Sequence, residues 1–451
     1  MKTYTVTTLG CKVNQYEGQQ MRQLLADLGL SAVALDAGPD LVIVNTCCVT
    51  HTASAKSRQL IRKSRNHNPD SIILIAGCLP VSPSGFPLDF GPRVISVENK
   101  DRLADTIVSL VGKHSCESSQ SSANAPKFQN QQCIETADER KQKTFNAEHE
   151  FSQLPLLKTF TEHSRAFLKV QDGCDGRCSY CIIPKIRTRV CNKNVKSAVE
   201  EAKALVLSGH CEIVLTGIFL GAYGHATVRR KFWNEKDLGA FVNLVDRISR
   251  IEGLKRLRLS SLEPGDVTDE LLKLFKKHHN LMPHLHLPLQ SGSERILKRM
   301  CRQYTLSQYV ATIDKIRTYI DRPAITTDVI VGFPGETEED FSQTLAIAED
   351  MAFSKIHVFR FSSREGTAAA KMQPVVSAEV IIERSQRMLN LDRRLQRQFR
   401  RQFVGERVSV LVEAGNPPAG RTERYFQVKI SDLEGVGQAG AGEIVEGKLL
   451  R

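Results

Sequence analysis

The sequence lacks long apolar runs. No stretch of the 451 residues approaches the roughly eighteen consecutive apolar positions that a membrane-spanning helix needs. Residues 1–6 have the pattern of a β-strand and not that of a signal peptide. Repeats of the solenoid type are also missing. These absences predict a cytoplasmic protein with no membrane partner.

Acidic residues are scarcer than basic ones. The sequence has 50 Asp and Glu against 62 Lys and Arg, which leaves a net charge of +12 and a pI near 9.1. This excess favours a polyanionic partner, and RNA or DNA is the obvious candidate. A basic protein kept soluble by its charge would look the same, so charge alone leaves nucleic-acid binding open.

Cysteine is the residue type that the sequence has in excess. Twelve cysteines are many for a cytosolic chain, where disulfides are disfavoured. Cysteines that recur in motif spacing in that compartment are more often metal ligands or catalytic groups. Their positions therefore carry the analysis of function.

The first hundred residues alternate between strand and helix patterns. Apolar, β-prone runs are found at residues 4–9, 41–44 and 71–76, and helical spacing at 14–28 and 53–65. A βαβαβ order of this kind predicts an open parallel sheet with helices on its faces.

A second alternating region begins near residue 166. Its predicted strands are residues 166–171, 212–216, 255–260, 284–287, 326–331 and 355–361. Helical patterns lie between them, at residues 195–208, 238–251, 306–319 and 338–351. Six βα units are too few for a closed eight-stranded barrel, so we expect a partial, open (β/α)6 barrel.

The remaining segments differ in composition. A polar stretch follows the first sheet, an arginine-rich helix follows the barrel, and the tail has short alternating strands with Gly-rich turns, typical of a small β-barrel. The fold class is therefore α/β, with a small β tail. The predicted units are residues 1–112, a linker at 113–158, a core at 159–377, a basic helix at 378–403 and the tail at 404–451.

The first cysteine set follows the first core strand. Cys174, Cys178 and Cys181 have the spacing C-x3-C-x2-C, and three thiolates on one loop can hold three irons of a cubane cluster. The fourth iron would keep an open position, which a catalytic metal needs. Structural zinc is the alternative, but it prefers four ligands and the loop supplies three.

The second set repeats one structural position. Cys11, Cys47 and Cys78 each follow a predicted strand of the N-terminal sheet. The carboxyl ends of parallel strands share one edge, so these thiols can converge. Three buried structural cysteines are the alternative. Cys48 directly follows Cys47 and could compete with it as a ligand.

Together these sets resemble the radical SAM (S-adenosylmethionine) methylthiotransferase family over almost the whole chain. The matching segments are residues 9–17, 45–47, 76–78, 182–184, 214–217, 260–264, 284–293 and 332–336, with Tyr180 as the aromatic residue before the last cysteine. The tail is similar to the TRAM domain, a small RNA-binding barrel. Residues 185–191 depart from the family pattern.

The resemblance implies a chemistry and its cofactors. It implies two [4Fe–4S] clusters and SAM: one cluster on the catalytic Cys174, Cys178 and Cys181, an auxiliary one on Cys11, Cys47 and Cys78. It further implies a tRNA anticodon loop as substrate, an electron donor of the flavodoxin or ferredoxin type, and a monomer.

The substrate branch follows from two motifs. Residues 10–17 and 215–224 look most like the branch that methylthiolates carbon 2 of N6-threonylcarbamoyladenosine at tRNA position 37. The isopentenyladenosine branch and the ribosomal-protein branch are the near alternatives. A non-catalytic iron–sulfur RNA sensor is the alternative from another class.

Further contacts are predicted from position. Residues at the ends of core strands are candidates for SAM binding: Tyr180, Thr216, Gly217, Ser261, Glu263, Gln290 and Ser291. Candidates for RNA binding are Arg393, Arg394, Arg397, Arg400, Arg401 and Tyr425. A solvated charged face and a small aromatic core would explain the second set equally well.

Overall fold

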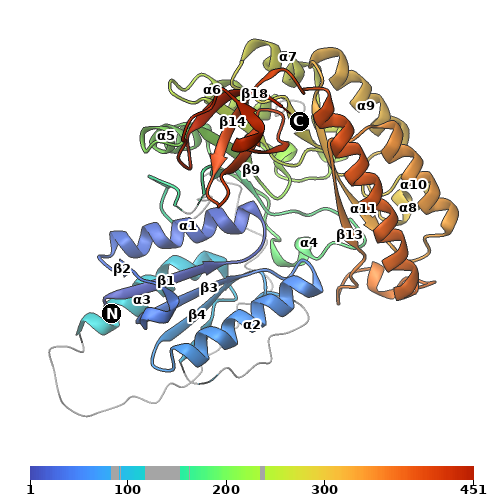
Figure 1. The fold of residues 1–451 in the computed structure, drawn as a ribbon. Helices are drawn as coiled ribbons and strands as arrows, with labels where there is room; N and C mark the ends of the chain where they lie inside the picture. The colour runs from blue at the N-terminus through green and yellow to red at the C-terminus, as the bar shows by residue number, and fades with distance from the viewer. Residues whose placement is uncertain (83–90, 92, 117–152, 162, 234–238, 451) are drawn as a thin grey trace.

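The chain folds into three parts, seen in a computed structural model (Figure 1). The structure describes residues 1–82, 91, 93–116, 153–161, 163–233 and 239–450. Most of the predicted linker lies outside these residues. Its last residues are packed: Leu157 is buried, and its amide donates to Glu201 Oε1 at 3.0 Å.

The N-terminal part is the predicted parallel sheet. Its strands have the order β2-β1-β3-β4-β5. They are β1 (Thr3–Thr8), β2 (Ser31–Ala32), β3 (Leu41–Thr46), β4 (Ile72–Gly77) and β5 (Val94–Ser96). The flanking helices are α1 (Lys12–Asp27), α2 (His51–His67) and α3 (Leu103–Cys116). Alternate residues of β3 face opposite sides: Ile43 packs with α1 and α3, and Val44 with α2.

The core is a partial barrel of six parallel strands. They are β6 (Ala166–Lys169), β9 (Glu212–Thr216), β10 (Arg256–Leu259), β11 (His284–His286), β12 (Ala324–Val331) and β13 (Lys355–Arg360). Two three-stranded sheets, β6-β9-β10 and β11-β12-β13, meet at bridges such as Ser261↔His286. A short antiparallel pair, β7 (Gln171–Asp172) and β8 (Cys191–Asn192), lies beside β6. The predicted open barrel is confirmed.

Helices cover the outside of the barrel (Figure 1). They are α5 (Val195–Leu207), α6 (Ala240–Ser249), α7 (Asp269–Lys277), α8 (Glu294–Arg299), α9 (Leu306–Tyr319) and α10 (Glu338–Asp350). The short helix α4 (Ile183–Ile186) instead packs against the N-terminal part, where Ile186 joins the cluster of Val44 and Ile61. The sequence analysis missed α7 and α8, because both are short. Thr305 caps α9 by accepting from the amide of Gln308, which fixes where that helix begins.

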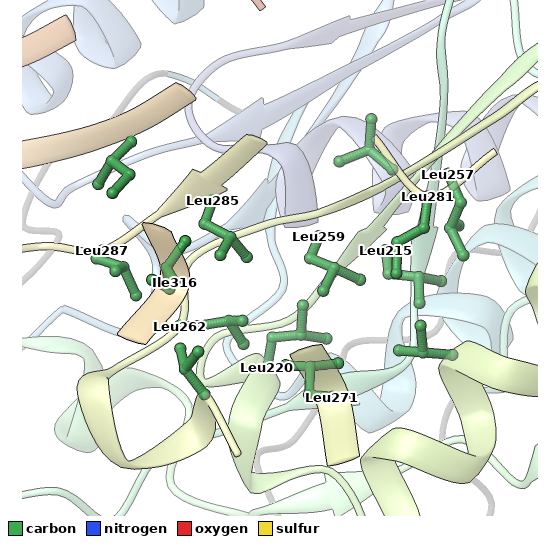
Figure 2. Packing of buried hydrophobic residues seen from close by; sticks show 14 of the residues in the cluster. Leu215, Leu220, Leu257, Leu259, Leu262, Leu271, Leu281, Leu285, Leu287 and Ile316 are labelled. Carbon is green, nitrogen blue, oxygen red and sulfur yellow. The ribbon is translucent and has the colours of Figure 1, made fainter. Parts of the chain in front are cut away.

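The alternation of the strands separates an apolar exterior from a polar interior. Leu215, Leu257, Leu259 and Leu285 pack outward against the helices (Figure 2). The intervening residues face the barrel interior and are polar: Glu212, Arg256, Arg258, His284, His286, Thr326 and Asp328. A barrel with a polar interior can hold a polar ligand, so this interior positions the site.

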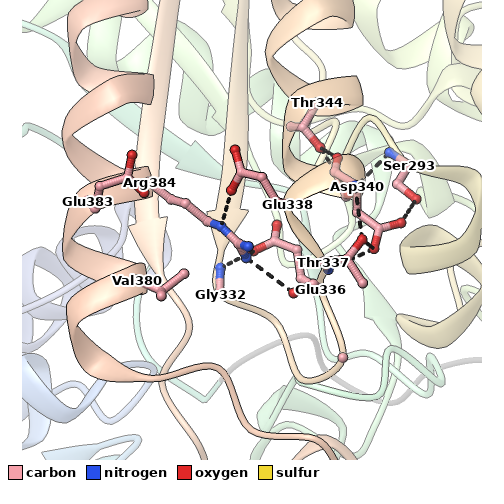
Figure 3. A network of polar contacts seen from close by, with 12 residues as sticks. Ser293, Gly332, Glu336, Thr337, Glu338, Asp340, Thr344, Val380, Glu383 and Arg384 are labelled. Carbon is pink, nitrogen blue, oxygen red and sulfur yellow. Dashed lines mark hydrogen bonds and ion pairs between the residues drawn. The ribbon is translucent and has the colours of Figure 1, made fainter.

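The long helix α11 (Ala378–Arg401) packs along β13. Its Arg384 donates to Glu336 Oε2 at 3.0 Å, and Glu336 also accepts from the Gly332 amide (Figure 3). The helix is thereby tied to the loop after β12. No helix of the described residues is long and apolar enough to cross a membrane.

The tail, predicted as a small β-barrel, is a five-stranded antiparallel sheet of half-barrel form, with strand order β16-β15-β14-β18-β17. Its strands are β14 (Arg407–Glu413), β15 (Ala419–Thr422), β16 (Gln427–Lys429), β17 (Leu433–Glu434) and β18 (Ile444–Leu449). Arg258, inside the barrel, donates to the carbonyls of Thr422 at 2.7 Å and Glu423 at 2.9 Å. The tail therefore packs on the amino ends of the barrel strands.

Candidate iron–sulfur and cofactor site

The loop after β7 presents three thiols. The Cys174 amide donates to the Arg187 carbonyl at 2.9 Å, and the Gly176 amide donates to Cys174 Sγ at 3.3 Å. Burial raises the pKa of Cys174 and of Cys181 to about 12, and the neighbouring Cys178 adds to both shifts. Such thiols ionise readily only when a metal takes the place of their protons.

The three N-terminal cysteines converge as predicted. Burial raises the pKa of Cys47 to about 11, with Cys78 and Cys11 adding to the shift. Burial also raises the pKa of Cys11, and Cys78 adds a smaller increase. A Cβ at Gly10 would lie 2.9 Å from Cys47 Sγ, so only glycine lets these segments approach. The strand ends thus bring together three thiols that are far apart in sequence.

Cys48 lies differently from Cys47. Its Sγ donates to the Cys78 carbonyl at 3.3 Å, and its side chain packs in the apolar cluster with Val42 and Ile61. Burial raises its pKa to about 12. The Cys47 thiol interacts electrostatically with Cys78 and Cys11, whereas the Cys48 thiol interacts with Cys78 and Cys47.

The thiols of each cysteine set are more widely spread than the sulfurs of a tetrahedral zinc site. Tetrahedral zinc with bonds of about 2.3 Å holds its sulfurs roughly 3.8 Å apart. Among the described residues, neither cysteine set gathers its three Sγ atoms within 4.8 Å of one another. A cubane, whose ligands sit on separate irons, needs that wider spacing.

Arg187 connects the two cysteine sets. Its carbonyl accepts from the Cys174 amide, and its Nη2 donates to Asn14 Oδ1 at 3.0 Å. Cys78 Sγ lies 3.9 Å from that same Asn14 oxygen. Arg187 belongs to the segment that departs from the family pattern, and the sequence analysis assigned it no role.

Buried charges surround Arg187. Its Nη1 contacts Glu17 Oε1 at 2.7 Å and Asp172 Oδ1 at 2.8 Å, and Lys169 contacts the same two carboxylates at 3.0 and 2.9 Å. Glu17 comes from α1 and the other three from the core. The network therefore fixes the N-terminal sheet against the barrel at the cysteine sites.

Arg302 is a second residue that the sequence analysis missed. Its Nη1 lies 3.3 Å from Cys178 Sγ and 3.3 Å from the Tyr180 hydroxyl, and its Nη2 donates to Glu263 Oε1 at 2.7 Å. Hydrogen bonds to ligand sulfur are one of the means by which a protein sets a cluster's potential. Nothing in the spacing of the cysteines pointed to it.

The predicted SAM contacts divide into two groups. Glu263 Oε2 is buried and has no hydrogen-bond partner among the described residues, although Arg230 Nη2 lies 3.6 Å away. The nearby Ser260 Oγ, which was not among the predicted contacts, is also buried without a hydrogen-bond partner there. Thr216 is the last residue of β9, at the carboxyl end of that strand. Gln290, in the loop after β11, has a left-handed backbone conformation with φ +63°. These residues could hold SAM beside the first cysteine set.

Of the other SAM candidates, Ser291 and Gly217 have structural roles, and Ser261 is exposed to solvent. The Ser291 hydroxyl pairs with Thr344 Oγ1 at 3.3 Å and with the Ser293 amide at 3.2 Å. A Cβ at Gly217 would lie 2.9 Å from Gln171 Cβ, so close packing explains that glycine. Ser261 is exposed beside β11.

The predicted RNA contacts also differ among themselves. Arg393 and Arg397 are exposed, whereas Arg394 pairs with Glu349 at 2.7 Å and Arg400 pairs with Asp432 of the tail at 3.1 Å. The Arg401 side chain is exposed. The Tyr425 ring stacks on His284, with centroids 4.2 Å apart, and so fills an internal contact.

Comparisons with known proteins agree with this geometry. A family model of the radical SAM superfamily matches residues 168–348, and one described as uncharacterized protein family UPF0004 matches residues 3–84. Among solved structures, the radical SAM methyltransferase TsrM from Kitasatospora setae has a TM-score of 0.54 at 15% identity. It covers 82% of this chain and 77% of its own, and shows a shared fold alone.

Closer relatives match nearly the full length. The chain is 33% identical to the threonylcarbamoyladenosine tRNA methylthiotransferase MtaB of Bacillus subtilis, over 100% of this chain and 94% of that protein. Identity to MtaB of Thermotoga maritima is 35%, over 92% and 87%. Identity to the tRNA-2-methylthio-N(6)-dimethylallyladenosine synthase of Thermobifida fusca is 34%, over 92% and 78%. The chain therefore belongs to the radical SAM methylthiotransferase family, whose members carry two [4Fe–4S] clusters and use SAM.

Proposed function

We propose that the protein attaches a methylthio group to carbon 2 of N6-threonylcarbamoyladenosine at position 37 of tRNA. The observation that carries this proposal is the contact of Arg187 with both cysteine sets, through the Cys174 amide and through Asn14 beside Cys78. Two clusters held on either side of one residue can act on one substrate atom. The full-length likeness to two proteins named for this nucleoside favours it over the dimethylallyl relative.

The target atom explains why such cofactors are needed. An aromatic C–H has no useful acidity for a general base, and chemistry of this kind is carried by cofactors. When bound, the clusters and SAM supply the radical, the sulfur and the methyl group.

The chain's own residues bind, orient and shield. We assign Cys174, Cys178 and Cys181 to one cluster and Cys11, Cys47 and Cys78 to the other. Arg302 would donate to the Cys178 sulfur, and Glu263 and Ser260 would hold the polar end of SAM. The target base must leave its loop stack to reach the barrel interior.

Partners follow from this chemistry. A reductive reaction needs an electron donor, and we propose one of the flavodoxin or ferredoxin type. We further propose a monomer that works in the cytoplasm, where its tRNA substrate is found.

Mass spectrometry of tRNA nucleosides tests the proposal. A host that lacks its own methylthiotransferases would express this protein or its Cys178→Ala form. We expect 2-methylthio-N6-threonylcarbamoyladenosine with the first and none with the second. A methylthio group on isopentenyladenosine would correct the substrate. No change in any nucleoside, with both clusters present, would exclude tRNA and direct the search to ribosomal proteins or to an RNA sensor.

A further inference from the structure

A basic cavity opens where β13, α11 and the tail meet. Its volume is about 480 Å³, within the range of ~300–1,000 Å³ that ligand pockets occupy. The residues that matter here are Thr326, His357, Arg393, Arg397, Arg421 and Tyr425. Arg393 and Arg397 are exposed and form the mouth, whereas Thr326 is buried in the barrel and lies at the floor.

Two lining residues of the floor, Thr326 and His357, are in contact with a polar cluster behind them. Side-chain ligand atoms of His286, Asp328 and His357 all lie within 4.8 Å of one another. His286 Nε2 is 3.4 Å from Asp328 Oδ2, and His286 Nδ1 is 2.9 Å from Thr326 Oγ1. The cavity therefore meets the His357 ring and the Thr326 side chain at its floor, and this floor cluster of His286, Asp328 and His357 makes that end of the cavity polar.

The floor cluster lies at the level of the SAM candidates. His286 forms a bridge with Ser261, and Gln290 forms one with Val329, next to Asp328. Asp328 is in register with His357 on the neighbouring strand. A group that entered the cavity and reached this floor would therefore lie inside the barrel, beside the ends of β10 and β11.

Charge decides what the cavity binds. Two histidines and a carboxylate could suit a divalent cation. However, the residues that line the cavity include Lys355, Arg393, Arg397 and Arg421 and no carboxylate. Lys355 is paired with Asp392 and Arg421 with Glu413, so the excess positive charge comes from the two arginines at the mouth. Arg393 and Arg397 have no ion-pair partner among the described residues, unlike Arg394 on the same helix. This potential repels a free cation and attracts a phosphate.

We propose that the basic cavity receives one unstacked nucleotide of the substrate RNA. Arg393 and Arg397 contact its phosphates at the mouth, and His357 hydrogen-bonds the edge of its base at the floor, where His286 and Asp328 support it from behind. Tyr425 forms a wall: its ring is held by His284 on one side and lies 4.6 Å from the Arg421 guanidinium. This inference rests on the proposed function and specifies where its substrate is read.

RNA binding tests the mouth. The affinity of the full-length, cluster-loaded protein for its target tRNA would be measured at several salt concentrations. Each lost phosphate contact lowers the salt slope by roughly 0.7 to 0.9. We expect this loss for Arg393→Gln and for Arg397→Gln, and about twice as much for the double variant. Arg387→Gln removes the same charge from α11 outside the cavity and should leave the slope unchanged. An unchanged slope in the double variant would overturn the proposal.

The contact between His357 and the base is tested by how much methylthiolated nucleoside forms for each SAM cleaved to 5′-deoxyadenosine. We expect His357→Ala to bind tRNA within about two-fold of the parent protein. Its ratio of methylthiolated nucleoside to 5′-deoxyadenosine should fall at least about ten-fold, and His357→Gln should recover part of that ratio. An unchanged ratio in His357→Ala would overturn the base contact. The base contact would also be overturned if the parent protein held one divalent ion per chain in addition to cluster iron and His357→Ala lost that ion.

The two failures can be told apart. If the parent protein forms no methylthiolated nucleoside, the proposed function fails. If the parent protein forms it and the cavity variants behave like the parent, the cavity assignment alone fails.

Discussion

Arg187 and Glu17 lie 170 positions apart and are joined by a paired contact, Nη1 to Oε1 at 2.7 Å and Nη2 to Oε2 at 2.8 Å. Two parallel N–H···O bonds of this kind fix the planes of both groups. Because Glu17 is on α1 and Arg187 follows the cysteine loop, the contact sets how the auxiliary cysteines face Cys174, Cys178 and Cys181.

Removal of Arg187 should loosen this arrangement. Both side chains are buried, and loss of one partner of a buried pair costs about 3–5 kcal/mol. We expect Arg187→Ala to lower the free energy of unfolding by that order in denaturant titrations. Arg189→Ala, whose pair with Asp101 is exposed, should cost about 0–1 kcal/mol. Equal effects of the two variants would contradict this role.

The same network should withstand mild acid. Burial alone would raise the pKa of Glu17, but Arg187, Lys100 and Lys169 outweigh it and hold that pKa well below 4.5. A depressed carboxyl pKa contributes stability above the unfolded value, and that stability is lost only as pH falls through the folded value. Stability measured against pH should therefore lose this contribution below about pH 4.5. Glu17→Gln should remove that acid-dependent part, and its loss already near pH 6 would contradict the pairing.

Cys47 and Cys48 should differ as cluster ligands. Cys47 interacts with Cys11 and Cys78, whereas the Cys48 thiol is engaged with the Cys78 carbonyl. Anaerobically reconstituted Cys47→Ala should lose about four of about eight irons per chain, and Cys48→Ala should keep them. Iron and sulfide analysis with EPR measures this. The reverse pattern would assign the auxiliary cluster to Cys48.

Arg302 should raise the reduction potential of the first cluster. Its cationic donor lies 3.3 Å from Cys178 Sγ and favours the more negatively charged, reduced state. We expect a more negative potential in Arg302→Gln by EPR-monitored redox titration, with Arg302→Lys closer to the parent. A potential that does not move would show that Arg302 serves only Glu263.

Glu336 should make the packing of α11 weaker as pH rises, in contrast to the Glu17 network, which weakens as pH falls. Burial raises its pKa to about 6, although Arg384 and the Gly332 amide favour the ionised form (Figure 3). A raised carboxyl pKa means that this group's contribution falls as pH rises from about 4.5 through 6. Glu336→Gln should flatten stability between these pH values in thermal unfolding. It should also lower stability overall, because Arg384 loses its buried partner.

Local patterns in the sequence predicted most of the elements. β3 and β9 are buried strands built around the apolar runs 41–44 and 213–215, and α9 has helical spacing behind a Thr305 cap, so each was predicted close to its observed bounds. The helices α7 and α8 were missed because segments of nine and six residues are too short for a helical pattern of apolar residues to be recognised. The tail sheet was predicted from its alternation and Gly-rich turns.

The six candidate cluster cysteines, and the order of the strands that present them, can be read from local sequence patterns. Thiolate spacing and strand periodicity are local properties, and parallel strands bring their carboxyl ends to one edge by geometry alone. Which charged and polar groups meet beside these cysteines is set by the three-dimensional packing of the chain. The pairs Glu17–Arg187, Cys178–Arg302 and His284–Tyr425 join segments more than one hundred residues apart. Their contacts depend on long-range packing of domains, which leaves no periodic signal in a single sequence.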